Sequence, residues 1–136
     1  MTSYLGLADY LLIAEAVLSV PAEVLLDVCD LALAESALNA PAATYGGQDL
    51  YPSMTAKAAA LTFRICNNHP LMDGNKRVAY QCLREFVARN GYPWFEPEGD
   101  IPDGDETVKT MWELAGGTLS EAELAVWIAD RIGETG

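Results

Sequence analysis

The sequence is poor in positive charge. It contains 8 lysine and arginine residues against 20 aspartate and glutamate residues, which gives a formal net charge of −12 over 136 residues. A nucleic-acid-binding surface needs basic side chains to neutralise phosphates, so this composition argues against general nucleic-acid binding. The same shortage argues against attraction to an anionic membrane surface. We therefore expect neither nucleic acid nor membrane among the partners.

Long apolar runs, paired cysteines and a basic N-terminal segment are also missing. Acidic residues interrupt the apolar stretches, so no transmembrane helix is expected. The 3 cysteines are odd in number and include no Cys-x-x-Cys pair, which argues against a disulfide framework or a structural zinc site. The start of the chain lacks the basic region of a signal peptide. These absences indicate reduced thiols in a cytoplasmic protein.

Apolar residues are plentiful and follow a helical period. They make up 51% of the chain, enough to build the core of one domain spanning residues 1–136. The period predicts helices over residues 7–18, 21–40, 55–68, 75–90 and 105–115, with a last helix after Ser120. Ser120 and Glu123 have the spacing of a capping box at the start of that last helix.

Two segments break this period because they are rich in turn-forming residues. Residues 41–53 predict a short hairpin or flap, and residues 93–104 predict a loop. No other stretch has the alternation of a strand. The sequence therefore predicts an all-α fold of five or six helices, with a short flap or hairpin before the motif described next.

Residues 69–77, His-Pro-Leu-Met-Asp-Gly-Asn-Lys-Arg, separate two predicted helices and concentrate groups that suit a phosphate. A helix that begins near Asn75 directs its free N–H groups and the positive end of its dipole at the preceding loop. Gly74 lets the backbone approach an anion closely. Lys76 and Arg77 add two cationic side chains. These features together predict an anion-binding nest.

The same segment carries candidates for a base and a metal ligand. His69 can accept a proton from a hydroxyl near neutral pH. Asp73 can ligate Mg²⁺, which prefers carboxylate and phosphate oxygens, although it could also simply cap the following helix. Five of the eight basic residues lie within residues 64–89, beside only two acids, which supports a local anionic ligand. Within this region we expect Arg89, far from the nest, to lie on a solvated helix face.

Residues 69–77 resemble the signature of the Fic/Doc superfamily, His-x-Phe-x-Asp/Glu-Gly-Asn-Gly/Lys-Arg, and the lysine variant is typical of the Doc (death-on-curing) branch. The similarity extends over about residues 5–132. It implies a compact Fic-fold helical bundle that uses ATP and Mg²⁺. In this family the roles would be general base for His69, metal ligand for Asp73, anion hole for Gly74, Asn75 and Lys76, and phosphate clamp for Arg77.

The resemblance also implies partners. The flap around Tyr45, Gly46 and Gly47 would hold a target segment in an extended form. Doc-type proteins are toxins that transfer the γ-phosphate of ATP to a threonine of elongation factor Tu and so block translation. A partner antitoxin silences them. Typical Fic proteins instead transfer AMP.

The sequence departs from the Fic pattern in four places. Leu71 stands where the family usually has phenylalanine, which predicts a packing adjustment. Lys76 replaces the second glycine of the Fic anion hole, and Tyr80 replaces a second arginine, so both disfavour AMP transfer. The self-inhibitory Fic motif is missing, because Val24 fails the last position after Ser19 and Glu23. An AMP transferase and a catalytically silent antitoxin-binding module remain the alternatives to a kinase toxin.

Several other side chains have plainer interpretations. Cys66 and Cys82 flank the motif, but a cysteine nucleophile would need a second histidine to activate it, and the chain has only one. We therefore expect both thiols in the core. The three tryptophans are expected to anchor the core rather than to stack on a ligand: Trp94, Trp112 and Trp127.

Overall fold

The computed structural model describes residues 1–96 and 105–133. This part of the chain is a mostly helical bundle with one short hairpin. Its elements in order are α1 (Leu7–Leu18), α2 (Ala22–Val28), α3 (Leu31–Asn39), the 3₁₀ helix η1 (Ala40–Ala42), β1 (Thr44–Tyr45), β2 (Gln48–Asp49), α4 (Met54–Asn68), α5 (Asn75–Arg89), α6 (Asp105–Ala115) and α7 (Glu121–Ile132). The all-α prediction is confirmed.

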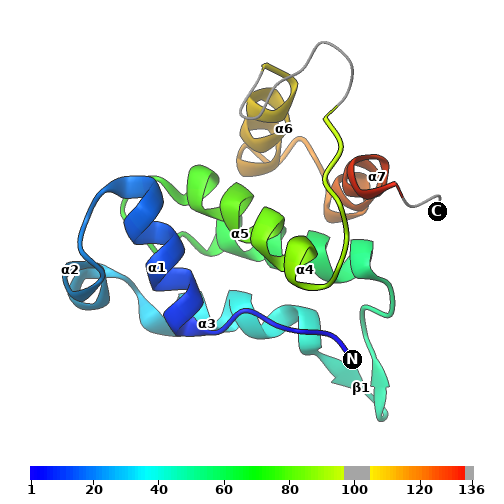
Figure 1. The fold of residues 1–136 in the computed structure, drawn as a ribbon, viewed down its shortest axis with the longest axis horizontal. Coiled ribbons are helices and arrows are strands. Elements are labelled where there is room, and N and C mark those ends of the chain that lie inside the picture. The colour runs from blue at the N-terminus through cyan, green and yellow to red at the C-terminus, as the bar shows by residue number, and fades with distance from the viewer. Residues whose placement is uncertain (97–104, 134–136) are drawn as a thin grey trace.

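Helix α4 lies at the centre of the bundle. It packs against α3, α5, α6 and α7, while α1 packs against α2, α3 and α5 (Figure 1). Its run of small residues, Ala58 to Ala60, is almost fully buried and lets neighbouring helices approach closely. The largest fully buried side chains include Tyr10, Leu61 and Phe86. The core therefore surrounds the two helices that flank the motif, and it holds both in place.

Helix starts follow the capping residues in the sequence. The Ser53 hydroxyl accepts a hydrogen bond from the Ala56 N–H at 3.1 Å and so caps α4. Ser120 and Glu123 form the expected capping box at the start of α7, with bonds of 3.1 Å and 3.0 Å. Each bond satisfies an N–H group that has no partner inside its helix.

The predicted helix over residues 21–40 is wrong, because the chain breaks it after Val28. Cys29 is extended, and the Asp30 side chain accepts a hydrogen bond from the Leu33 N–H at 3.1 Å, so Asp30 caps a new helix, α3. The Asp30 N–H donates to the Pro70 carbonyl at 2.8 Å instead of to its own helix. The break thus ties this region to the motif loop, and it raises the number of described α-helices to seven.

The hairpin predicted within residues 41–53 is confirmed. Strands β1 and β2 pair antiparallel, with Thr44 opposite Asp49 and Tyr45 opposite Gln48. A hairpin this short is marginal alone, and Lys57 stabilises it. The buried Lys57 ammonium contacts the Asp49 carboxylate at 3.1 Å. Burial, the largest single influence, lowers the lysine pKa, but hydrogen bonds and charge interactions with Asp49 and Tyr4 together offset it, and the pKa is raised.

The other predicted loop is covered in part. It spans residues 93–104, of which 97–104 lie outside the described residues. Among the helices that the structure does describe, none has the length and apolar character needed to cross a membrane.

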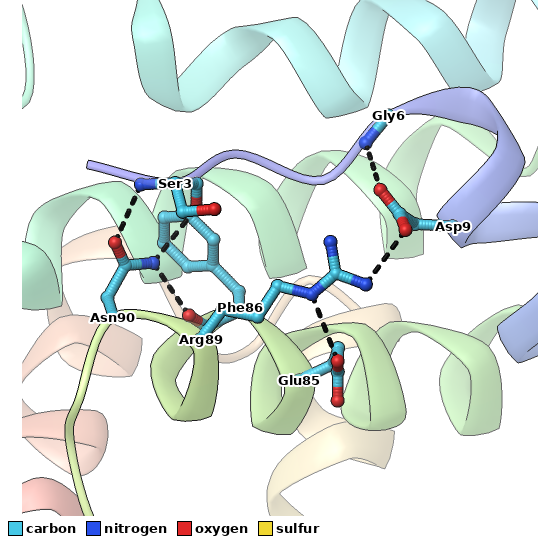
Figure 2. Close-up of polar contacts among 7 residues, drawn as sticks. All are labelled: Ser3, Gly6, Asp9, Glu85, Phe86, Arg89 and Asn90. Carbon is cyan, nitrogen blue, oxygen red and sulfur yellow. Dashed lines mark hydrogen bonds and ion pairs between the residues drawn. The ribbon is translucent and has the colours of Figure 1, made fainter. Parts of the chain in front are cut away.

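The C-terminal end of α5 is fastened to the N-terminal segment (Figure 2). Arg89 Nη2 donates to Asp9 Oδ1 at 2.8 Å, and Arg89 Nε donates to Glu85 Oε1 at 3.0 Å. Asn90 Nδ2 donates to the Ser3 carbonyl at 2.9 Å, and the Ser3 N–H donates to Asn90 Oδ1 at 2.7 Å. Arg89 is therefore more than a solvated helix residue, because it joins α5 to α1.

Candidate functional site

The motif loop between α4 and α5 is held from the side of α3. The Pro70 carbonyl accepts the hydrogen bond from Asp30, and Asn68 Nδ2 donates to the Leu33 carbonyl at 3.1 Å. Leu71 is buried in the core, so the apolar position keeps its packing role without the phenylalanine ring. The loop therefore has fixed ends, and its exposed side chains project from a rigid base.

His69 stands at the end of α4 in a left-handed backbone conformation, with φ 50° and ψ 57°. Residues other than glycine seldom adopt positive φ, and histidine does so more readily than most. Strained backbone of this kind concentrates at functional sites. The side chain is exposed, so a solvent-borne substrate can reach the imidazole.

Asn75 braces the loop with its side chain. Its Oδ1 accepts a hydrogen bond from the Leu71 N–H at 3.1 Å, and its Nδ2 donates to the Leu71 carbonyl at 2.8 Å. The side chain is buried by these bonds, with the residue 9% exposed. The sequence predicts that Asn75 binds phosphate. Both polar atoms of its side chain instead form hydrogen bonds with the backbone of Leu71. Only its backbone N–H, in the first turn of α5, is placed to meet an anion.

Gly74 is required by backbone shape and by packing. It caps α5 with φ 84°, and a Cβ added there would come within 2.5 Å of Leu18 Cδ2. The face of Gly74 that a side chain would occupy is therefore turned toward α1. The glycine lets α1 and the start of α5 approach each other, in addition to any close approach of a ligand.

Asp73 is exposed, and its Oδ1 accepts a hydrogen bond from the Gly74 N–H at 2.8 Å. In the described part of the chain, no three histidine, cysteine, aspartate or glutamate side chains gather as a ready metal site. Mg²⁺ is often bound by one or two carboxylates that act together with substrate phosphates. A lone, exposed carboxylate beside an anion-binding helix end fits that kind of metal binding.

Lys76 and Arg77 occupy the first turn of α5, which contains no acidic residue. Among the described residues, neither side chain forms an ion pair. The Lys76 ammonium instead lies over the ring of Trp112, 4.2 Å from its centroid. Positive charge at the positive end of a helix dipole is unfavourable without an anion. The start of α5 can therefore accept an anionic ligand.

A partly open groove leads away from this helix end. It encloses about 1130 Å³ between α1, α5, α6 and the segment 92–94. Its lining includes three cations of α5, the carboxylate of Glu85 and aromatic side chains: Lys76, Arg77 and Arg84, and Tyr92, Trp94 and Trp112. Arg84 also lies over the ring of Trp94, 5.8 Å from its centroid. A groove lined by three cations and several aromatic rings can accept an anionic ligand with a flat ring.

Comparison with known proteins agrees with this geometry. A model of the Fic/DOC family matches residues 13–87, which are more than half of the chain and include the whole motif. The chain belongs to the Fic/DOC family. A protein named Toxin Doc, from Mycolicibacterium smegmatis, is 44% identical over 66 residues, which cover 48% of this chain and 51% of that protein. The Fic/DOC chain thus spans about half the length of this curated relative.

The flap residues of this Fic/DOC chain lie far from the motif. The hairpin contacts Lys57 in the first turn of α4, whereas His69 ends the same helix. The helix between them is about 18 Å long at the standard rise of about 1.5 Å per residue. In Figure 1 the hairpin lies at the lower right, at the opposite end of the bundle from α2. The structure therefore does not bring Tyr45, Gly46 and Gly47 together with the motif loop.

Two predictions about side chains near the Fic/DOC motif have opposite outcomes. The cysteines are confirmed as core residues, because both are buried and free. That burial raises the pKa of Cys66 and of Cys82 to about 12, which keeps the thiols protonated at neutral pH. The prediction for Trp112 is wrong. Its side chain is 63% exposed and lines the groove. Trp94 and Trp127 do pack against the core.

Sequence reasoning missed three residues that shape the Fic/DOC site: Leu18, Asp30 and Trp112. Asp30 had a local signal, since an aspartate before an apolar run is a common helix start. Leu18 and Trp112 had none, because each meets the motif through tertiary packing of a distant helix.

Proposed function

We propose that this Fic/DOC chain is a Doc-like toxin that transfers the γ-phosphate of ATP to a serine or threonine hydroxyl of a target protein. The observation that carries the proposal is the start of α5. There, two cations without acidic partners in the described residues follow, by seven and eight positions along the chain, an exposed histidine in a left-handed conformation. This combination offers a base and an anion site in one loop.

In the proposed reaction His69 accepts the proton of the target hydroxyl, and the hydroxyl oxygen attacks the γ-phosphorus. The bond from that phosphorus to the β–γ bridging oxygen breaks, and ADP leaves. The backbone N–H groups at the start of α5, with Lys76 and Arg77, stabilise the negative charge on the phosphate oxygens. Because Asn75 fixes the loop, these donors are already oriented before the substrate arrives.

Asp73 would hold Mg²⁺ together with phosphate oxygens of ATP, and the ion would neutralise part of the phosphate charge. The remaining oxygen of its carboxylate is available because only Oδ1 is bonded to the Gly74 N–H. The hydrogen bond from the Gly74 N–H also keeps the Asp73 carboxylate next to the helix end where the phosphates would lie.

Transfer of AMP is the second candidate, and two residues disfavour it. Lys76 fills the place of the second glycine in the Fic anion hole. Tyr80, in the place of a second arginine, is buried and packs edge-on against Trp94 with ring centroids 5.9 Å apart. A buried tyrosine cannot supply the charge that an arginine would give to a nucleotide.

The partners in this proposal are a target protein and an antitoxin. By resemblance the target is elongation factor Tu, and its modification would block translation. The antitoxin is expected on a separate chain because the self-inhibitory Fic sequence is incomplete here. A role for the hairpin in holding the target stays a prediction. It would concern target residues roughly 18 Å from the reacting hydroxyl, the rise of the helix from Lys57 to His69.

The decisive experiment uses ATP labelled at either the α or the γ position, mixed with the purified chain and with either cell extract or purified elongation factor Tu. We expect γ-label on a protein band, and no label when His69→Asn replaces the wild type. Transfer of the α-label would show that the chain is an AMP transferase and not a kinase. If ATP binds but neither label is transferred in the absence of antitoxin, a catalytically silent binding module is the better description.

A further inference from the structure

The contact between Lys76 and Trp112 joins the motif to a helix outside the matched family region. Lys76 is the second residue of α5, and Trp112 lies on α6, beyond residues 13–87. The ammonium lies 4.2 Å from the ring centroid, well within the range of a cation–π interaction. Among the described residues, no carboxylate forms an ion pair with this ammonium.

The position of Trp112 needs an explanation. Its side chain is 63% exposed, although neighbouring members of α6 such as Met111 and Leu114 are buried. An exposed tryptophan contributes little to the core, and this one lies against the Lys76 ammonium in the lining of the groove. A lysine side chain is flexible, and holding it in one place before binding lowers the entropy lost when a ligand is bound.

We propose that Trp112 is a positioning residue that holds the Lys76 side chain, from the first turn of α5, in the lining of the groove, ready for the phosphates of the nucleotide. The inference rests on the proposed function, because it assigns Lys76 to a nucleotide phosphate. The ring face attracts the cation without neutralising it, so the full charge remains available to the ligand. A carboxylate in the same place would compete with the phosphate.

A double-mutant cycle separates this role from direct contact between Trp112 and the ligand. The dissociation constant of ATP with Mg²⁺ is measured by calorimetry for the wild type, Trp112→Leu, Lys76→Met and the double variant. Trp112→Leu is expected to weaken binding about two- to fivefold, the effect of one exposed cation–π contact. In the Lys76→Met background the same change should have no further effect.

Two additional variants provide controls. Trp112→Phe keeps an aromatic face and should restore most of the affinity. Val126→Ala shortens a residue that is 67% exposed on α7 and does not line the groove, and it should leave binding unchanged. Because Trp112 is exposed, we expect all variants to fold, and thermal unfolding checks this.

Each remaining outcome overturns the inference in a recognisable way. Unchanged affinity in Trp112→Leu shows that the ring does not position Lys76. An equal loss in both backgrounds shows that the ring contacts the nucleotide itself. If the wild type binds no ATP, the proposed function fails and the inference fails with it.

Discussion

The two ends of α5 differ in whether their basic side chains form ion pairs with acidic residues. At the C-terminal end, Arg89 is held by Asp9 at 2.8 Å and by Glu85 at 3.0 Å (Figure 2). At the N-terminal end, Lys76 and Arg77 have no acidic partner among the described residues. The chain itself pairs the charge at one end of the helix, and at the other end the described residues leave it without an acidic partner.

This difference is informative because the chain has 20 acidic residues that could have formed ion pairs at either end. A cation near the C-terminus of a helix is already favoured by the helix dipole, yet Arg89 receives two carboxylates. Lys76 and Arg77 stand where the dipole disfavours them, yet no acid is placed in that turn. Local stability would favour the reverse arrangement, so the N-terminal end is better explained by binding than by folding.

The strongest test of the N-terminal end removes its base. His69→Asn should reduce phosphate transfer by about 100- to 10,000-fold, the usual contribution of a general base. Asparagine tolerates the left-handed conformation at this position, so the free energy of unfolding should change little. Activity is measured with γ-labelled ATP and stability with urea. Retention of more than about one tenth of the activity would exclude His69 as the base.

The next largest effect concerns how the N-terminal end packs on α1. Gly74→Ala should lower the free energy of unfolding by about 2–4 kcal/mol, because the new Cβ meets Leu18 at 2.5 Å and φ is positive. Gly117→Ala is the matched control, since its φ is 81° but nothing lies within 4 Å of the added Cβ. It should cost only about 1–2 kcal/mol. Equal costs in urea unfolding would show that Leu18 makes no tight contact.

A smaller loss of stability is expected when the ion pair at the C-terminal end of α5 is removed. The hydrogen bond from Arg89, followed by that from the Gly6 N–H, holds the pKa of Asp9 below its usual value. Asp9→Asn should therefore destabilise the protein by about 1 kcal/mol at neutral pH, without changing nucleotide binding.

The pH dependence of that effect has a definite sign. A depressed carboxyl pKa stabilises the fold above the unfolded value of about 3.9, and the stabilisation is lost as pH falls through the folded pKa. The difference between wild type and Asp9→Asn, measured by urea unfolding, should stay constant above about pH 5 and shrink below about pH 4. A difference that grew on acidification would contradict the ion pair.

Much of the fold could be predicted because it is encoded locally. Apolar spacing indicated the helices, and Ser53, Ser120 and Glu123 indicated where two of them begin. The break after Val28 was missed because the apolar period continues across it. The Asp30 side chain, which caps α3, was a local signal for the break. The hydrogen bond from the Asp30 N–H to Pro70 joins segments 40 residues apart, and periodicity carries no information about such a contact.

The sequence predicted which residues belong to the candidate site better than it predicted how they are arranged in space. The motif brought His69, Asp73 and the start of α5 into one loop because they are neighbours in sequence. The hairpin was correctly placed along the chain, but its position in space depends on the direction of α4, which carries it away from His69. Similarly, only tertiary packing places Trp112 over Lys76.

The central claim, that the two ends of α5 differ in function, is tested most directly by a pair of arginine variants. ATP binding in the presence of Mg²⁺ is measured by calorimetry for wild type, Arg77→Gln and Arg89→Gln, which remove the same charge from opposite ends of one helix. The account predicts affinity about tenfold or more weaker for Arg77→Gln, the loss of one charged hydrogen bond, and unchanged affinity for Arg89→Gln. Equal affinities in the two variants, or equal losses, would contradict it.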